Sequence, residues 1–190
     1  MSPVPEWTAE GIIPAFDYLE PAGFNNRAPY KSDLLELIER FGTSIERCEI
    51  LRGFLKFREK LHTMGLQKGF QWVNGSFVED VETIRQRSPS DIDVISFHQY
   101  PDQSTVDGWT KHDLQTFNAT YTKRTYKVDA YFENLDSASS YLVSRSTYWF
   151  GLFTHQKNTF AWKGCLQISL EPRNDSDAVE LLTDIEKGMQ

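Results

Sequence analysis

Two strand-like segments joined by a polar loop constrain this chain most strongly. The first segment ends in Gly75-Ser76, and the second carries two aspartates, Asp91 and Asp93, one residue apart. Side chains alternate between the faces of a strand, so the two carboxylates are expected to share one face and the apolar residues the other. Adjacent carboxylates repel each other unless a cation lies between them. The pair therefore predicts a site for a hard divalent cation such as Mg²⁺.

A third candidate carboxylate follows on a later segment. Asp129 lies within Tyr126-Lys127-Val128-Asp129-Ala130-Tyr131-Phe132, whose aromatic and β-branched residues favour a strand. Each element also has an ordinary structural interpretation: Asp-x-Asp can be a solvated strand face, Gly-Ser a simple turn, and Asp129 a surface residue. The order in which the three occur favours a shared site.

Gly-Ser, a loop and Asp-x-Asp on a strand resemble the signature of the DNA polymerase beta-like nucleotidyltransferase superfamily, which a third carboxylate completes. The resemblance covers residues 68–132. The loop of fourteen residues from Phe77 to Ser90 is longer than is usual in that superfamily. The whole chain, including Gly-Ile-Ile-Pro near its start and Trp162-Lys163-Gly164 near its end, also resembles a family of small stand-alone nucleotidyltransferase-like proteins.

The resemblance implies an α+β nucleotidyltransferase fold, a small mixed sheet flanked by helices. It implies that Asp91, Asp93 and Asp129 are catalytic and bind Mg²⁺, with Mn²⁺ as a substitute. The expected nucleotide contacts are Gly75, Ser76, Lys127 and Lys163. A solvated basic cluster is the alternative for Lys127 and its neighbours Lys123 and Arg124. The carboxylates of Glu79, Asp80 and Glu82 are expected in a solvated loop.

The expected activity is transfer of a nucleoside monophosphate from an NTP, ATP included, to a hydroxyl of tRNA, a protein or a small molecule. Small members of the superfamily often occur in toxin–antitoxin or phage-defence modules, which suggests that context and a cognate partner protein. The main alternative is a catalytically inactive antitoxin or regulatory module whose aromatic-rich C-terminal region binds a protein. A nuclease using the same carboxylates is a third possibility.

Composition and charge argue against several classes of protein and of binding site. A net charge of −7 argues against a protein that coats nucleic acid nonspecifically. The two cysteines, Cys48 and Cys165, lie far apart in apolar contexts and predict buried free thiols, not a zinc site. Since no apolar stretch approaches about 18 residues, no membrane span is expected, and a cytoplasmic protein is predicted.

Five prolines in residues 1–30 predict an extended N-terminal arm, followed by a single domain over residues 31–190. The expected helices cover residues 31–41 with Ser32 as N-cap, 44–64 with Ser44 as N-cap, 113–119, 137–150, and 175 or 176 to 187. The expected strands cover residues 70–74, 91–97, 123–132 and 161–170, and residues 98–112 are expected to form a loop.

Overall fold

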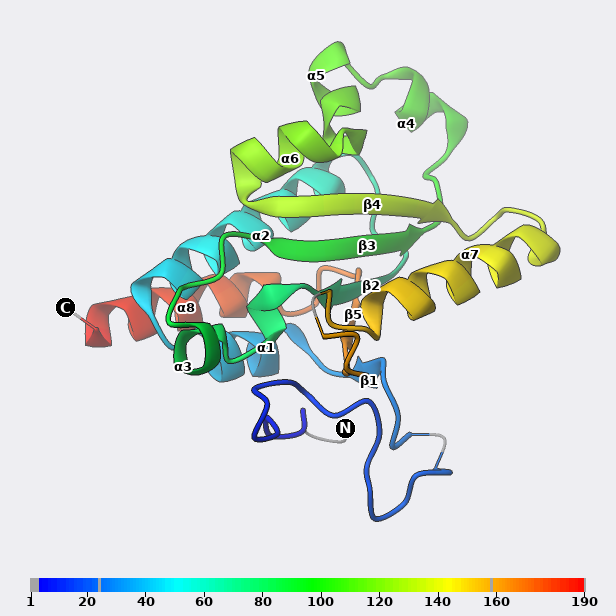
Figure 1. The fold of residues 1–190 in the computed structure, drawn as a ribbon. Helices are drawn as coiled ribbons and strands as arrows, with labels where there is room; N and C mark the ends of the chain where they lie inside the picture. The colour runs from blue at the N-terminus through cyan, green and yellow to red at the C-terminus, as the bar shows by residue number, and fades with distance from the viewer. Residues whose placement is uncertain (1–3, 24, 158, 190) are drawn as a thin grey trace.

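A five-stranded mixed sheet forms the centre of the protein (Figure 1). The computed structural model describes residues 4–23, 25–157 and 159–189. In spatial order the strands are β1 (Tyr30–Lys31), β5 (Leu166–Ser169), β2 (Gly69–Asn74), β3 (Ile92–His98) and β4 (Val128–Asn134). The outer pairs β1–β5 and β3–β4 are parallel, whereas β2 is antiparallel to both β5 and β3. The expected α+β class with a mixed sheet and flanking helices is confirmed.

The two faces of the sheet are covered by different helices. Phe132 on β4 packs against Phe57 of α2 (Ile45–Thr63). The preceding residue, Tyr131, instead packs against Trp149 of α7 (Ser139–Phe153). Since neighbouring side chains on a strand point to opposite faces, α2 and α7 lie on opposite sides of the sheet. Asp129, two residues before Tyr131, therefore projects from the α7 face.

The α2 face holds most of the core. Helices α1 (Leu34–Phe41) and α2 both pack against the C-terminal helix α8 (Asp175–Gly188). Arg58 of α2 is fully buried there and donates to Gln71 on β2 and to Asp175 on α8. Ser44 caps α2 as expected, but Asp33, not Ser32, accepts the capping bond of α1 because its carboxylate reaches the Glu36 amide.

The segment before β4 differs most from its prediction. Residues 123–126 were expected in a strand but belong to α6 (Ala119–Tyr126). The Asn118 side chain caps its start, and Lys127 ends it in a left-handed conformation, so the strand begins only at Val128. Gly53 lets α6 approach α2, because a Cβ there would overlap with the Tyr126 carbonyl oxygen.

Short helices also occupy the expected loop over residues 98–112. They are α4 (Gln103–Asp107), capped by Asp102, and α5 (Lys111–Leu114), whose Thr110 and Asp113 form a capping box. A single 3₁₀ turn, η2 (Gln115–Phe117), then leads to α6, where one helix over residues 113–119 was expected. These helices are too short for apolar periodicity to reveal them.

Two further segments complete the chain. The connection from β2 to β3 contains the 3₁₀ turn η1 (Ser76–Val78) and α3 (Val81–Arg85). The N-terminal residues that the structure describes lie against it, since the Trp7 indole donates to the Val78 carbonyl. In the described parts of the chain, no helix combines the length and apolar character of a membrane span.

Candidate functional site

The predicted carboxylates meet at one end of the parallel strands β3 and β4. Asp93 and Asp129 are register partners, so their side chains stand side by side on the α7 face. Asp91 immediately precedes β3 and is largely buried. The alternation predicted for residues 91–94 thus places three carboxylates near each other from two adjacent strands.

A lysine lies between two of these carboxylates. The Lys123 Nζ, near the end of α6, is 2.6 Å from Asp91 Oδ2 and 3.4 Å from Asp129 Oδ2. The hydrogen bond to Asp91 raises the pKa of Lys123, so its ammonium group stays charged. Lys123 therefore supplies part of the positive charge that the aspartates require.

Asp93 is the least compensated member of the cluster. Burial raises the pKa of its carboxyl to about 6, and the neighbouring Asp91 and Asp129 carboxylates raise it too. Opposite Asp93 in the β2–β3 register lies Asn74, which is 4% exposed. Its Nδ2 donates to the Phe153 carbonyl at 2.6 Å, and its buried Oδ1 has no partner among the described residues. Sequence reasoning missed Asn74, because an asparagine ending a strand is ordinary.

Gly75 closes the site on the β2 side. Its φ of +87° and ψ of −166° fall in a region essentially restricted to glycine. A Cβ at this position would overlap with Asp93 Oδ2. Gly75 was expected to contact the nucleotide. The structure shows that its lack of a Cβ makes room for the Asp93 carboxylate.

Replacing Gly75 with alanine is expected to lower the free energy of unfolding by about 1–3 kcal/mol, because backbone strain and the displacement of Asp93 both act. Denaturant unfolding followed by tryptophan fluorescence measures the change. The control is Gly151→Ala in α7, where no atom lies within 4 Å of the added Cβ, so a gain of about 0.5–1 kcal/mol is expected. Equal effects at both glycines would contradict the assignment.

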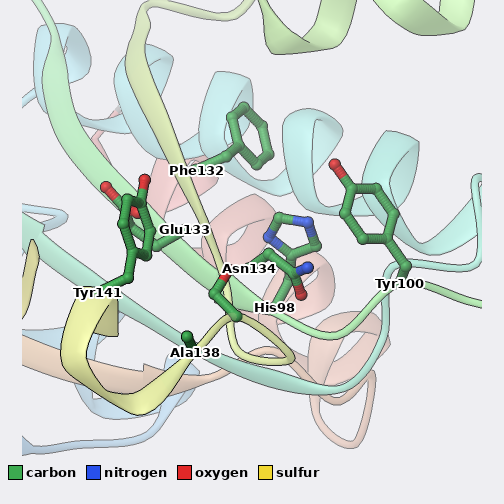
Figure 2. A pocket seen from close by; sticks show the side chains of 8 residues that line it. His98, Tyr100, Phe132, Glu133, Asn134, Ala138 and Tyr141 are labelled. Carbon is green, nitrogen blue, oxygen red and sulfur yellow. The ribbon is translucent and has the colours of Figure 1, made fainter. Parts of the chain in front are cut away.

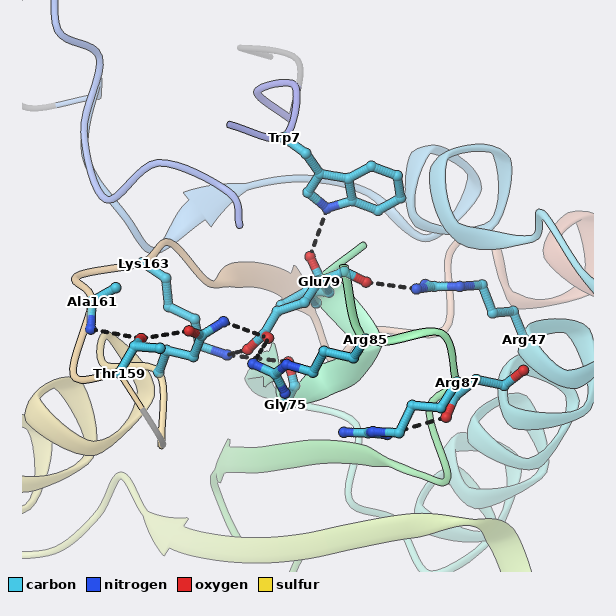
Figure 3. A network of polar contacts seen from close by, with 12 residues as sticks. Trp7, Arg47, Gly75, Glu79, Arg85, Arg87, Thr159, Ala161 and Lys163 are labelled. Carbon is cyan, nitrogen blue, oxygen red and sulfur yellow. Dashed lines mark hydrogen bonds and ion pairs between the residues drawn. The ribbon is translucent and has the colours of Figure 1, made fainter. Parts of the chain in front are cut away.

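The loop after Gly75 is held by a buried ionic network (Figure 3). Glu79 was expected to be solvated, but it is 4% exposed and accepts from Lys163 at 2.6 Å, Arg85 at 3.0 Å and Gln156 at 2.8 Å. The buried Arg47 donates to the Phe77 and Glu79 carbonyls and to the Glu82 carboxylate. The partners come from distant parts of the chain, so no local pattern reveals the network.

Of the four expected nucleotide contacts, three lie on the side of the aspartate cluster and one does not. Gly75 adjoins Asp93 and is followed by Ser76. The Lys163 Nζ lies 3.1 Å from the Gly75 carbonyl oxygen, although Glu79 also binds it. Lys127, by contrast, is directed away from the cluster. Its Nζ is 2.7 Å from Glu49 Oε2 on α2, the helix of the other face. The neighbouring Lys123 occupies the position beside the aspartates.

The cluster has the chemistry, but not the closed geometry, of a magnesium site. Three carboxylates and an amide oxygen are hard ligands of the kind that Mg²⁺ prefers. As the side chains stand, however, no three His, Cys, Asp or Glu residues of the described chain are arranged to hold a metal. The raised pKa of Asp93 and the Lys123 ammonium both indicate that the cluster requires positive charge, so the donor set fits a divalent cation.

A cavity of about 510 Å³ lies at the opposite end of the same strands (Figure 2). His98 and Asn134, the last residues of β3 and β4, line it together with Tyr100 and Tyr141. Burial lowers the pKa of His98, which favours the neutral ring. The cavity contains none of the predicted site residues.

Comparison with known proteins identifies a family without an assigned activity. No curated protein and no solved structure matches the chain. A family model described as "Family of unknown function (DUF6932)" matches residues 5–169. Over most of its length, therefore, the chain belongs to the family DUF6932.

Proposed function

We propose that the protein has a nucleotidyltransferase fold and is a Mg²⁺-dependent nucleotidyltransferase, with Mn²⁺ as a substitute. One observation carries the proposal: Asp93 and Asp129 are register partners on parallel strands, and the Gly75-Ser76 turn closes directly on Asp93. This arrangement agrees with the order of motifs that the superfamily resemblance implies. An NTP is the proposed donor of the nucleoside monophosphate.

The reaction joins an acceptor hydroxyl oxygen to the α-phosphorus and breaks the bond to pyrophosphate. Bound Mg²⁺ would supply charge stabilisation for the entering and leaving oxygens. Asp91, Asp93 and Asp129 would hold it, and Asp129 would accept the hydroxyl proton. The Ser76 hydroxyl makes no hydrogen bond to other described residues, so it can donate to a phosphate oxygen.

The acceptor class is proposed as tRNA, a protein or a small molecule. The net charge of −7 makes the last two easier to reconcile with long-range electrostatics than bulk RNA. A role in a toxin–antitoxin or phage-defence module, with a cognate partner, is part of the proposal through the superfamily resemblance.

Transfer of α-phosphate label tests the activity directly. Each of the four α-³²P-labelled NTPs is incubated with the protein, Mg²⁺ or Mn²⁺, and cell extract. We expect metal-dependent labelling of an acceptor with release of one pyrophosphate per transfer, and a loss of about a thousandfold or more in Asp91→Ala/Asp93→Ala, because charge stabilisation at the phosphate is lost. Release of nucleotide without pyrophosphate would indicate a nuclease instead.

A matched control removes two carboxylates that are exposed on helices. Glu59→Ala/Glu180→Ala changes net charge equally but leaves the cluster intact, so label transfer should be unchanged. Failure of the wild-type protein to transfer label from any NTP would contradict the proposal.

A second function is favoured by the outer face of α7. The exposed apolar side chains on it are Tyr141, Tyr148 and Leu152, which are 49%, 53% and 53% exposed and share a face because they are seven and four residues apart. Arg145 is the one charged residue in the helix. Such a surface suits a protein interface, as expected for a catalytically inactive regulatory module. Stable co-purification of a partner without label transfer would support this alternative, especially if Tyr148→Ser/Leu152→Ser abolished it.

A further inference from the structure

The acidic cluster contains more acceptors than its internal cation can satisfy. An ammonium group has three donors, and Lys123 contacts Asp91 and Asp129. It makes no ion pair with Asp93 in the described structure. Asn74, the register partner of Asp93 on β2, also has an unpartnered Oδ1 although the residue is buried. Among the described residues, two of the four acceptor side chains, those of Asp93 and Asn74, thus have acceptor oxygens that Lys123 does not satisfy.

The position of Lys123 allows its ammonium group to move away from the aspartates. Its side chain is half exposed, and it projects from the last turn of α6, a short helix at the edge of the sheet. The flexible four-carbon stem of lysine lets the ammonium group move by several ångströms without any change in the backbone. The aspartates, in contrast, are fixed by β3 and by its register with β4.

We propose that Lys123 is a tethered counter-ion that a divalent cation displaces from Asp91 and Asp129, and that the displaced ammonium group then binds the phosphates of the nucleotide. The inference rests on the proposed function and assigns Lys123 as a nucleotide-binding residue of that site. Asn74 Oδ1 then accepts a hydrogen bond from water bound to the cation.

Displacement couples the two ligands. Without nucleotide, the cation must compete with Lys123, which weakens its binding. With nucleotide present, the phosphate oxygens receive the displaced ammonium group, so each ligand strengthens the binding of the other. Lys123 thereby disfavours loading of the site by metal alone.

Binding of Mn²⁺ alone, measured by electron paramagnetic resonance, tests the first half. We expect Lys123→Met to bind Mn²⁺ about tenfold more tightly than the wild type. Lys123→Arg should bind it more weakly, because a guanidinium group grips two carboxylates more firmly. Lys123→Arg retains the positive charge. If the methionine variant does not fold, Mn²⁺ binding by the arginine variant still tests the counter-ion role. Arg124→Met, which removes the adjacent exposed cation, should match the wild type.

Equilibrium dialysis of an α,β-methylene NTP at saturating Mg²⁺ tests the second half, and Lys123→Met should bind it about tenfold more weakly. Unchanged or weaker Mn²⁺ binding by Lys123→Met, with binding still abolished by Asp93→Asn, would overturn the counter-ion role and leave the proposed function standing. No Mn²⁺ binding by the wild type or by any variant would overturn both.

Discussion

Asp93→Asn is expected to stabilise the metal-free protein at pH 8 by on the order of 3 kcal/mol while abolishing label transfer. Burial, with Asp91 and Asp129 nearby, raises the pKa of Asp93 from 3.8 to about 6. Each unit of pKa shift corresponds to about 1.4 kcal/mol between the two protonation states. The ionised carboxylate therefore destabilises the folded protein, and asparagine removes its charge at nearly constant shape.

The sign of the pH dependence follows from the two pKa values. At pH 4 the wild type has only a small penalty, because the folded carboxyl is protonated and the unfolded one is only partly ionised. Between pH 4 and 6 the unfolded chain releases its proton first, and the wild type loses stability relative to the variant; above pH 6 the difference is constant. Urea unfolding in EDTA at pH 4 and pH 8 measures both limits.

Asp102→Asn serves as a control for which the opposite change in stability is expected. Hydrogen bonds from the Ser104 side chain and the Thr105 amide lower the pKa of Asp102 to about 2, so its ionised form favours the folded state. This variant should be less stable at pH 8 than the wild type. If Asp93→Asn were destabilising by the same amount at both pH values, a packing defect and not charge would explain it.

Stability and activity move in opposite directions in Asp93→Asn, as they often do at functional sites. The charge that destabilises the metal-free protein is the charge that would hold Mg²⁺. We expect label transfer to fall about a thousandfold or more. A gain in stability without any loss of transfer would remove Asp93 from the proposed site.

The strands that carry the aspartates could be predicted because their pattern is local. Alternation placed Asp93 and Asp129 on the correct strands, and β3 extends one residue beyond its predicted end. The strand prediction for residues 123–126 was wrong because Thr125 and Tyr126 favour strands. The Asn118 cap and the close packing of α6 on α2 outweigh that propensity.

The supporting parts of the site could not be predicted, because they depend on contacts far apart in sequence. Lys163 and Glu79 are 84 residues apart, and Gln156 and Glu79 are 77 apart. Glu79 follows a turn in a charged segment, which is the usual context of a solvated carboxylate. Lys127 was chosen over Lys123 for nucleotide binding, and only the helical path of residues 119–126 brings Lys123 to the aspartates.

Lys163→Met is expected to lower the free energy of unfolding by on the order of 3 kcal/mol, because it leaves the Glu79 carboxylate buried with one of its two cations. It also removes the donor to the Gly75 carbonyl. Lys127→Met is the matched control: it breaks an ion pair between side chains that are both about half exposed, and should cost at most about 1 kcal/mol. Denaturant unfolding of both variants measures the difference.

A double-mutant cycle shows whether the cost comes from the pair itself. Glu79→Gln alone leaves Lys163 charged and buried, so it should be about as costly as Lys163→Met. The double variant has neither buried charge and should lose clearly less than the sum of the two, with a coupling energy of roughly 1–3 kcal/mol. Additive losses, or a cost for Lys163→Met no larger than that for Lys127→Met, would mean that the two side chains do not depend on each other. In that case Lys163 would be free to bind a phosphate, as the sequence suggested.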